Sequence, residues 1–253
     1  AGSVLCGVLL YGLLLYWIVP VLHTFGGLNW ALAAVSTALL WFYMSWYLVI
    51  FGCGFFLLYS RGQRLLWFVT MPVLWVGLDW LRSFVFSGFP WMDLGYGLYQ
   101  LPRLIQATDV VGHHGYTFMV VMLNTTLFLG VNRTTRVHPW RGVRTPVAIC
   151  VSLVLLITGY SGVRHAGKEQ FIQDTKRAVV GVVQGNIAQQ QKWSASEKTR
   201  ILEKYTRLSN GLAQTQAPLL MIWPETALPM VPGQNSETEL LMDYLEDAHV
   251  PLL

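Results

Sequence analysis

Long apolar runs alternate with short polar or glycine-bearing loops over residues 1–163. A helix needs about 20 mainly apolar residues to cross the hydrocarbon core of a bilayer, and these runs come close to that length with few charges. We therefore expect a membrane region of about five helical spans. The expected spans are 4–22, 33–59, 65–83, 116–131 and 146–160.

Two features within this region carry charge or break the helical pattern. Asp79 and Arg82 stand three residues apart in the third span, so a helix would place them on one face, and we expect a structural ion pair there. Between residues 83 and 115, glycines and Pro90 exclude a long regular helix, while aromatic residues are frequent. This stretch is either a floor or gate for a lipid substrate at the membrane surface or a simple interfacial anchor.

The pattern changes after a polar linker, expected over 164–177. Residues 178–183 are β-branched and apolar, as in a buried strand, and 218–223 form a second such run. Between and after these strands, apolar residues recur at helical spacing, and Val250 begins a third strand. The order strand, helix, strand, helix, strand over 178–253 indicates the beginning of an α/β layer fold.

Composition supports a membrane protein with a water-exposed part. The chain is 54% hydrophobic and 12% charged, compared with about 25% charged residues in average soluble proteins. The net charge of +4 comes from bases in loops rather than from a basic patch interleaved with aromatics, so we expect no nucleic-acid partner.

Loop charge gives an orientation. Arg61 and Arg64 share one loop, and four further arginines lie in the loop at 132–145. The positive-inside rule assigns both loops to the cytoplasm, so the chain after Tyr160 is expected on the opposite side. The four arginines are Arg133, Arg136, Arg141 and Arg144.

Cysteine and histidine give no sign of a metal or cofactor. Cys6, Cys53 and Cys150 lie in apolar runs, and their odd number and spacing favour small buried core residues over a disulfide framework or a zinc site. His113 and His114 are adjacent, but the sequence shows no further ligands close to them. We therefore expect neither a metal site nor a cofactor.

Glu225 is the candidate catalytic residue. It follows the strand 218–223 and Pro224, which cannot continue a strand ladder, so it stands where a strand ends. In α/β folds such positions commonly carry the chemistry, and a carboxylate there can act as a general base. We expect Trp223, Pro224 and Pro229 to desolvate the turn. The alternative is a solvated loop residue after an edge strand.

Several motifs together resemble a known family. The runs 182–187, 192–193 and 223–229 are similar to the start of a nitrilase-type (carbon–nitrogen hydrolase) domain, in the version found in apolipoprotein N-acyltransferases of bacterial inner membranes. The runs 23–27, 79–82 and 88–91, with 94–96, are similar to the membrane part of the same family. The resemblance implies an αββα sandwich beginning at 178–253, on the periplasmic side of a multi-pass inner-membrane protein.

The resemblance also implies a chemistry. The family uses a Glu-Lys-Cys triad, of which Glu225 is the Glu, while the Lys and Cys are expected beyond Leu253, so the chain alone should be an inactive fragment. The parent would transfer an acyl chain from a phospholipid, through a thioester, to the α-amine of a diacylated apolipoprotein. Trp193 matches a tryptophan placed near the substrate, or else it is a packing residue at a helix start.

Two other functions stay open at the level of sequence. A membrane-tethered nitrilase-type amidase or hydrolase would use water as the acceptor and release free fatty acid or ammonia. A non-enzymatic transporter or scaffold would instead need charged residues facing one another inside the membrane bundle.

Overall fold

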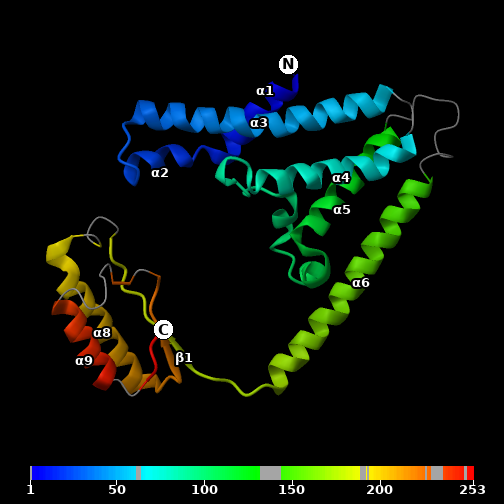
Figure 1. Cartoon of the computed structure of the whole chain (residues 1–253). Coiled ribbons are helices and arrows are strands. Elements are labelled where there is room, and N and C mark those ends of the chain that lie inside the picture. Colours follow the sequence, from blue (N-terminus) through cyan, green and yellow to red (C-terminus); the bar gives the residue numbers. More distant parts are fainter. Residues whose placement is uncertain are drawn as a thin grey trace. The chain divides into compact units, whose positions relative to one another are not determined.

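A computed structural model describes residues 2–60, 64–131, 144–188, 192, 194–225, 227–228, 236–247 and 250–253. The chain divides into two compact units, Ala1–Gln173 and Asp174–Leu253, each of which is described by itself (Figure 1). The division falls within the expected linker.

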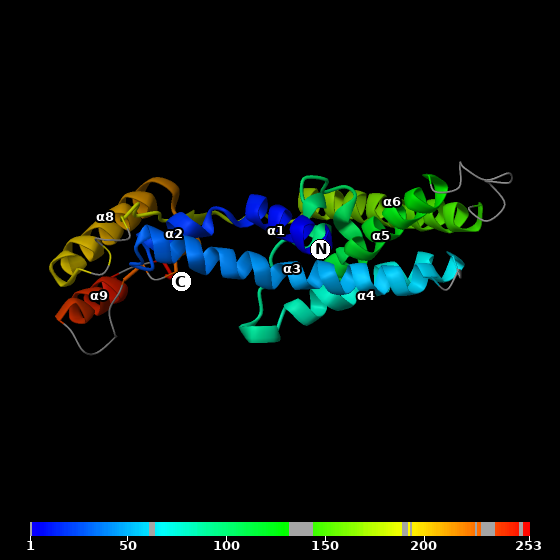
Figure 2. The same cartoon turned by 90° about the horizontal axis from the view of Figure 1, so that it is seen from above.

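The first unit is helical. In it α1 (Gly2–Leu15) packs along α3 (Trp30–Ser60), and α4 (Arg64–Arg82) packs against α5 (Thr108–Val131), as both views show (Figures 1 and 2). The remaining helices are α2 (Ile18–Thr24) and α6 (Arg144–Asp174), with the short 3-10 turns η1 (Val85–Ser87), η2 (Leu94–Leu98) and η3 (Ile105–Ala107) between α4 and α5.

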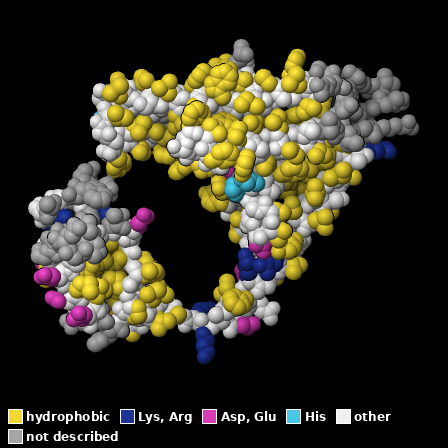
Figure 3. Space-filling view, in the orientation of Figure 1, with side chains coloured by type: hydrophobic (Ala, Val, Ile, Leu, Met, Phe, Trp, Pro, Cys, Tyr) yellow, Lys and Arg dark blue, Asp and Glu magenta, His cyan; other side chains and the backbone are white. Residues whose placement is uncertain are grey.

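Three helices among the described residues are long and apolar enough to cross a membrane, over 30–58, 105–131 and 144–174. The pair α1 and α2, which meet at a bend of 53°, adds a fourth if it is one span. Helix α4 covers the third expected span, carries Asp79 and Arg82 near its C-terminal end, and gathers its apolar residues on one face. Side chains on the visible face of the first unit are mostly hydrophobic, as a lipid-facing surface requires (Figure 3).

Two boundaries differ from the sequence-based expectation. Helix α5 begins at Thr108 rather than near 116, although Gly112 breaks its regular geometry with φ 63° and ψ −176°. The linker expected over 164–177 is helical as far as Asp174, since residues such as Ala166, Lys168 and Glu169 favour helix even outside an apolar run.

The second unit is built on parallel strands. Strand β1 (Val180–Val182) pairs in parallel with β2 (Leu220–Ile222), with Gly181 opposite Met221. The chain end adds a parallel bridge on the other side of β2, where the Met221 amide donates to the Pro251 carbonyl at 2.8 Å. Helices α8 (Lys198–Gln216) and α9 (Ser236–Asp247) complete the alternating order that the sequence predicts. A short turn, η4 (Ala195–Glu197), leads into α8.

One apolar core holds this unit together. The buried face of α8 contributes Ile201, Leu202 and Tyr205, which pack with Met221 of β2 and with Trp223. Partly buried residues of α9 and of the chain end join the same core. The segment that carries Glu225 is therefore anchored on one side by a packed helix.

Candidate functional site

Glu225 lies in a turn directly after β2, at the C-terminal edge of the parallel pair. The turn is closed by the Ala227 amide, which donates to the Pro224 carbonyl at 3.0 Å. The Glu225 side chain is exposed, so the expected desolvation by Trp223 and Pro224 is wrong, while Pro229 lies outside the described residues.

The reason is the direction of the Trp223 side chain. Trp223 is buried, its ring lies 5.0 Å from the ring of Tyr205, and its indole N–H donates to Ser209 Oγ at 2.9 Å. The indole therefore fills the core beneath the turn instead of covering the carboxylate. Pro224, the next residue, is itself exposed.

The end of β1 lies at the same edge. After Val183, whose amide donates to the Ile222 carbonyl at 2.9 Å, the chain turns through Gly185 and Asn186. Asn186 has φ 47°, and its side-chain oxygen accepts a hydrogen bond from Gln184 Nε2 at 2.9 Å. This local bond between Gln184 and Asn186 stabilises the turn.

Lys192 is a neighbour of Glu225 that the sequence did not single out. Its Nζ donates to the main-chain carbonyl of Glu225 at 3.4 Å. The sequence could have indicated Lys192, because it directly precedes Trp193 in the motif on which the resemblance rests. Trp193, the candidate substrate contact, lies outside the described residues.

A depression of about 490 Å³ opens beside the Asn186 turn. Its walls are mostly polar and charged side chains of α8 and the turn before it, including Arg200, Lys204 and Arg207. Glu225 does not line it. The carboxylate and this depression are therefore separate features of the second unit.

The first unit contains a buried charge cluster. The predicted pair is confirmed: Arg82 Nη2 lies 3.0 Å from Asp79 Oδ1, with both side chains buried. The same guanidinium also forms an ion pair with Asp93 and donates to the Tyr11 hydroxyl at 3.2 Å. Arg82 thus joins α1, α4 and the loop before α5.

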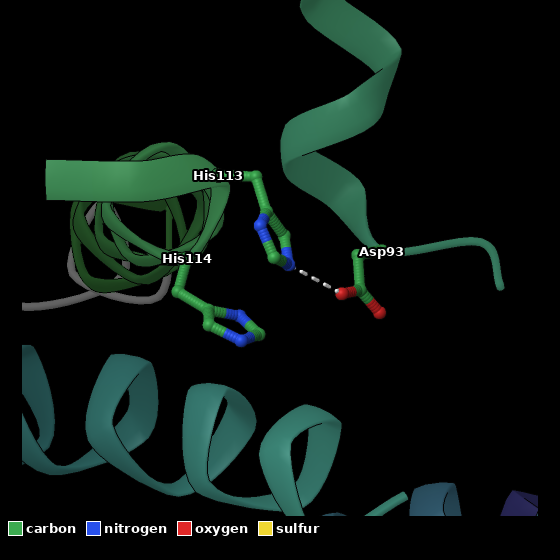
Figure 4. A group of neighbouring side chains, drawn as sticks. All are labelled: Asp93, His113 and His114. Carbon is green, nitrogen blue, oxygen red and sulfur yellow. Dashed lines mark hydrogen bonds and ion pairs between the residues drawn. The ribbon is translucent and has the colours of Figure 1, made fainter. Parts of the chain in front are cut away.

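Asp93 extends the cluster to the two histidines (Figure 4). Its second oxygen, Oδ2, accepts a hydrogen bond from His113 Nε2 at 3.0 Å, and the His114 ring lies 3.9 Å from the His113 ring. Sequence reasoning missed Asp93, although it is the only acid between residues 83 and 107. A single acidic residue in an otherwise apolar loop could have indicated a buried, paired carboxyl group.

The cysteines agree only in part with the expectation of small buried residues. Cys150 is buried, with its Sγ 3.1 Å from Thr126 Oγ1. Cys6 and Cys53 are exposed on α1 and α3, so burial was wrong for both. The reason is that an apolar helix in a bilayer turns apolar residues outward as well as inward.

The fold indicates the class of protein. It is a membrane protein whose apolar helices precede a small unit of alternating parallel strands and helices. Residues 1–126 match the family described as "Apolipoprotein N-acyltransferase N-terminal domain". The apolipoprotein N-acyltransferase of Geobacter metallireducens is 31% identical over 88% of this chain and 42% of its own length. Those of Photobacterium profundum and Vibrio cholerae are each 30% identical, over 89% and 84% of this chain and 40% and 39% of their own lengths.

The chain belongs to the apolipoprotein N-acyltransferase family. It spans about two fifths of the length of these relatives. The similarity to them extends past the matched domain into the second unit, since it covers well over two thirds of the chain.

Proposed function

We propose that the protein to which this chain belongs transfers a fatty acyl chain from a phospholipid to the N-terminal amine of a diacylglyceryl-cysteine in apolipoproteins. The family and the names of its relatives support acyl transfer. The observation that carries the chemistry is the position of Glu225, exposed at the C-terminal edge of a parallel sheet, where a side chain is free to meet a substrate.

The 178–253 segment is proposed as the start of a nitrilase-like αββα sandwich. Its alternating order and the parallel pairing of β1, β2 and the chain end support this, because parallel strands joined by helices form one layer of such folds. The triad lysine and cysteine are expected in the sequence after Leu253.

In the first half of the reaction Glu225 is the general base. It takes the proton of the cysteine thiol, and the thiolate attacks an ester carbonyl of the phospholipid. The lysine ammonium stabilises the oxyanion, which collapses to a thioester. The departing lysophospholipid alkoxide receives the proton that Glu225 holds.

In the second half the free α-amine attacks the thioester carbonyl. Glu225 accepts the proton of the amine, and the tetrahedral intermediate collapses to an amide as the thiolate leaves and takes the proton that Glu225 holds. Trp193 is proposed to contact the substrate. Lys192 holds the main chain of Glu225 and so positions the carboxylate.

The proposed location is the bacterial inner membrane, with the second unit on the periplasmic side. The arginines that the sequence gathers within 61–64 and 132–145 support this orientation. Both substrates are lipids, so an active site on a membrane protein is chemically reasonable.

The test uses the full-length protein with Glu225→Gln, which keeps the shape of the side chain and removes the base. The variant is incubated with phospholipid and analysed by mass spectrometry for a thioester-linked acyl chain. We expect acyl-enzyme formation to fall by at least about 100-fold, the range of general-base catalysis.

Glu203→Gln is the matched control, because Glu203 is an exposed carboxylate on α8 of the same unit. Acylation by Glu225→Gln equal to that by the control would remove Glu225 from the mechanism. Acyl-enzyme that yields free fatty acid, with no modified lipoprotein in the presence of acceptor, would instead favour the hydrolase alternative.

A further inference from the structure

We propose that Asp93, His113 and His114 form a binding site for a divalent transition-metal ion such as Zn²⁺. One ligand atom from each residue lies within 4.8 Å of those of the other two. The site belongs to the first unit and is independent of the acyl-transfer proposal, since Glu225 takes no part in it.

The backbone explains how two consecutive histidines reach the same point. In a regular helix neighbouring side chains diverge by about 100°. Gly112, with φ 63°, interrupts α5 just before His113. The two rings then lie 3.9 Å apart, and one nitrogen of His114 faces the His113–Asp93 pair (Figure 4).

The ligand atoms are close to the spacing that a metal needs. Ligands about 2.0–2.1 Å from a tetrahedral ion stand about 3.3 Å from one another. The His113 Nε2 to Asp93 Oδ2 distance is already 3.0 Å. Side-chain rotations would bring in the His114 ring.

His114 supplies an independent observation. Its Nδ1 is buried and has no hydrogen-bond partner among the described residues. A buried imidazole nitrogen without a partner is costly, and coordination to a cation would satisfy it.

The surroundings hold two of the three ligands in position. Arg82 binds the other oxygen of Asp93, which leaves Oδ2 directed at His113. The ring of Tyr96 stacks on His113 at 4.6 Å with planes 13° apart. Such outer contacts commonly orient ligands in metal sites.

Donor chemistry and charge select the ion. Two imidazole nitrogens and one carboxylate oxygen suit Zn²⁺, Co²⁺ or Ni²⁺ better than Mg²⁺ or Ca²⁺, which prefer oxygen. Asp79 and Asp93 present two carboxyl groups to the single guanidinium of Arg82. A bound cation would add positive charge beside these carboxyl groups.

The site has a structural use. Asp93 lies directly before η2, and the histidines lie in α5, so a bound ion would tie the loop after α4 to the kinked start of α5. An ion that binds the folded state but not the unfolded state raises the thermal stability of the protein.

The experiment measures metal binding to the purified full-length protein in detergent after chelator treatment. Titration with Co²⁺, followed by visible absorption, and with Zn²⁺, followed by calorimetry, should show one ion per chain. His114→Ala should weaken binding at least about 100-fold, and the wild type but not the variant should melt at a higher temperature with Zn²⁺.

His165→Ala is the matched control, because His165 pairs with Glu169 on the surface of α6, away from the cluster. A second variant, His113→Gln, guards against a folding defect in the first. The proposal is overturned if the wild type binds no ion, or if both cluster variants bind as tightly as His165→Ala.

Discussion

Arg82 faces two buried carboxyl groups, and this makes it sensitive to substitution. Its side chain is 3% exposed, and those of Asp79 and Asp93 are 5% and 2% exposed. Removing one partner of a buried ionic group leaves the others uncompensated in a poorly polarisable environment. The cluster thus depends on a single guanidinium.

We expect Arg82→Met to lower the free energy of unfolding by about 3–5 kcal/mol. The measurement is unfolding of the purified protein in detergent. Arg164→Met is the control, because its pair with Asp109 is largely exposed and should contribute at most about 1 kcal/mol. Equal losses in the two variants would show that the buried cluster has no special role.

Trp223 gives a second prediction for a single contact. Trp223→Phe removes the donor to the buried Ser209 hydroxyl and should cost about 1–3 kcal/mol. In the double variant with Ser209→Ala, the hydroxyl that lost its partner is gone too, so part of the loss should return. If the double variant is less stable than Trp223→Phe alone, the indole acts only through its volume.

At this scale the sequence predicts charge pairs within one helix and little beyond. The spacing of Asp79 and Arg82 sufficed because a helix fixes their relation. The spacing could not place Asp93 beside His113, because that contact depends on how a loop folds back on α5. The inward direction of the Trp223 side chain depends on packing, so the sequence could not predict it either.

At the scale of elements, the contact between η2 and α5 depends on a glycine. The Gly95 amide donates to Thr117 Oγ1 at 3.0 Å, and an added Cβ would collide with the His113 carbonyl oxygen. The close approach of loop and helix therefore requires the absence of a side chain at residue 95.

Gly95→Ala should destabilise the first unit by about 1–3 kcal/mol, as overpacking does. Gly97→Ala is the control, since a Cβ there meets nothing within 4 Å. Thermal unfolding of both variants in detergent checks the difference. An unchanged melting temperature for Gly95→Ala would mean that η2 moves away from α5 without cost.

Helices and strands were predicted well where their signal is local. Apolar runs marked α3, and the β-branched run 178–183 marked β1. The ends of α5 and α6 were missed, because polar residues extend both helices past the apolar runs on which the prediction rested.

At the scale of the whole molecule, the proposed orientation is open to a direct test. In a full-length variant in which every native cysteine, including the proposed nucleophile, is replaced by alanine, we expect Lys198→Cys on α8 to react with a membrane-impermeant maleimide in intact spheroplasts. Arg136→Cys, in the arginine-rich loop, should react only after lysis. The reverse pattern would place the second unit in the cytoplasm.

The length of α3 has a consequence for the lipid around it. Its apolar part, residues 30–58, contains 29 residues and measures about 44 Å, while the hydrocarbon layer is about 30 Å thick. Complete immersion would need an inclination near 45°, well above the usual value of about 20°. A thicker bilayer accommodates the surplus length of α3, so this protein should be most stable among long-chain lipids. In thin membranes hydrophobic mismatch would lower its stability.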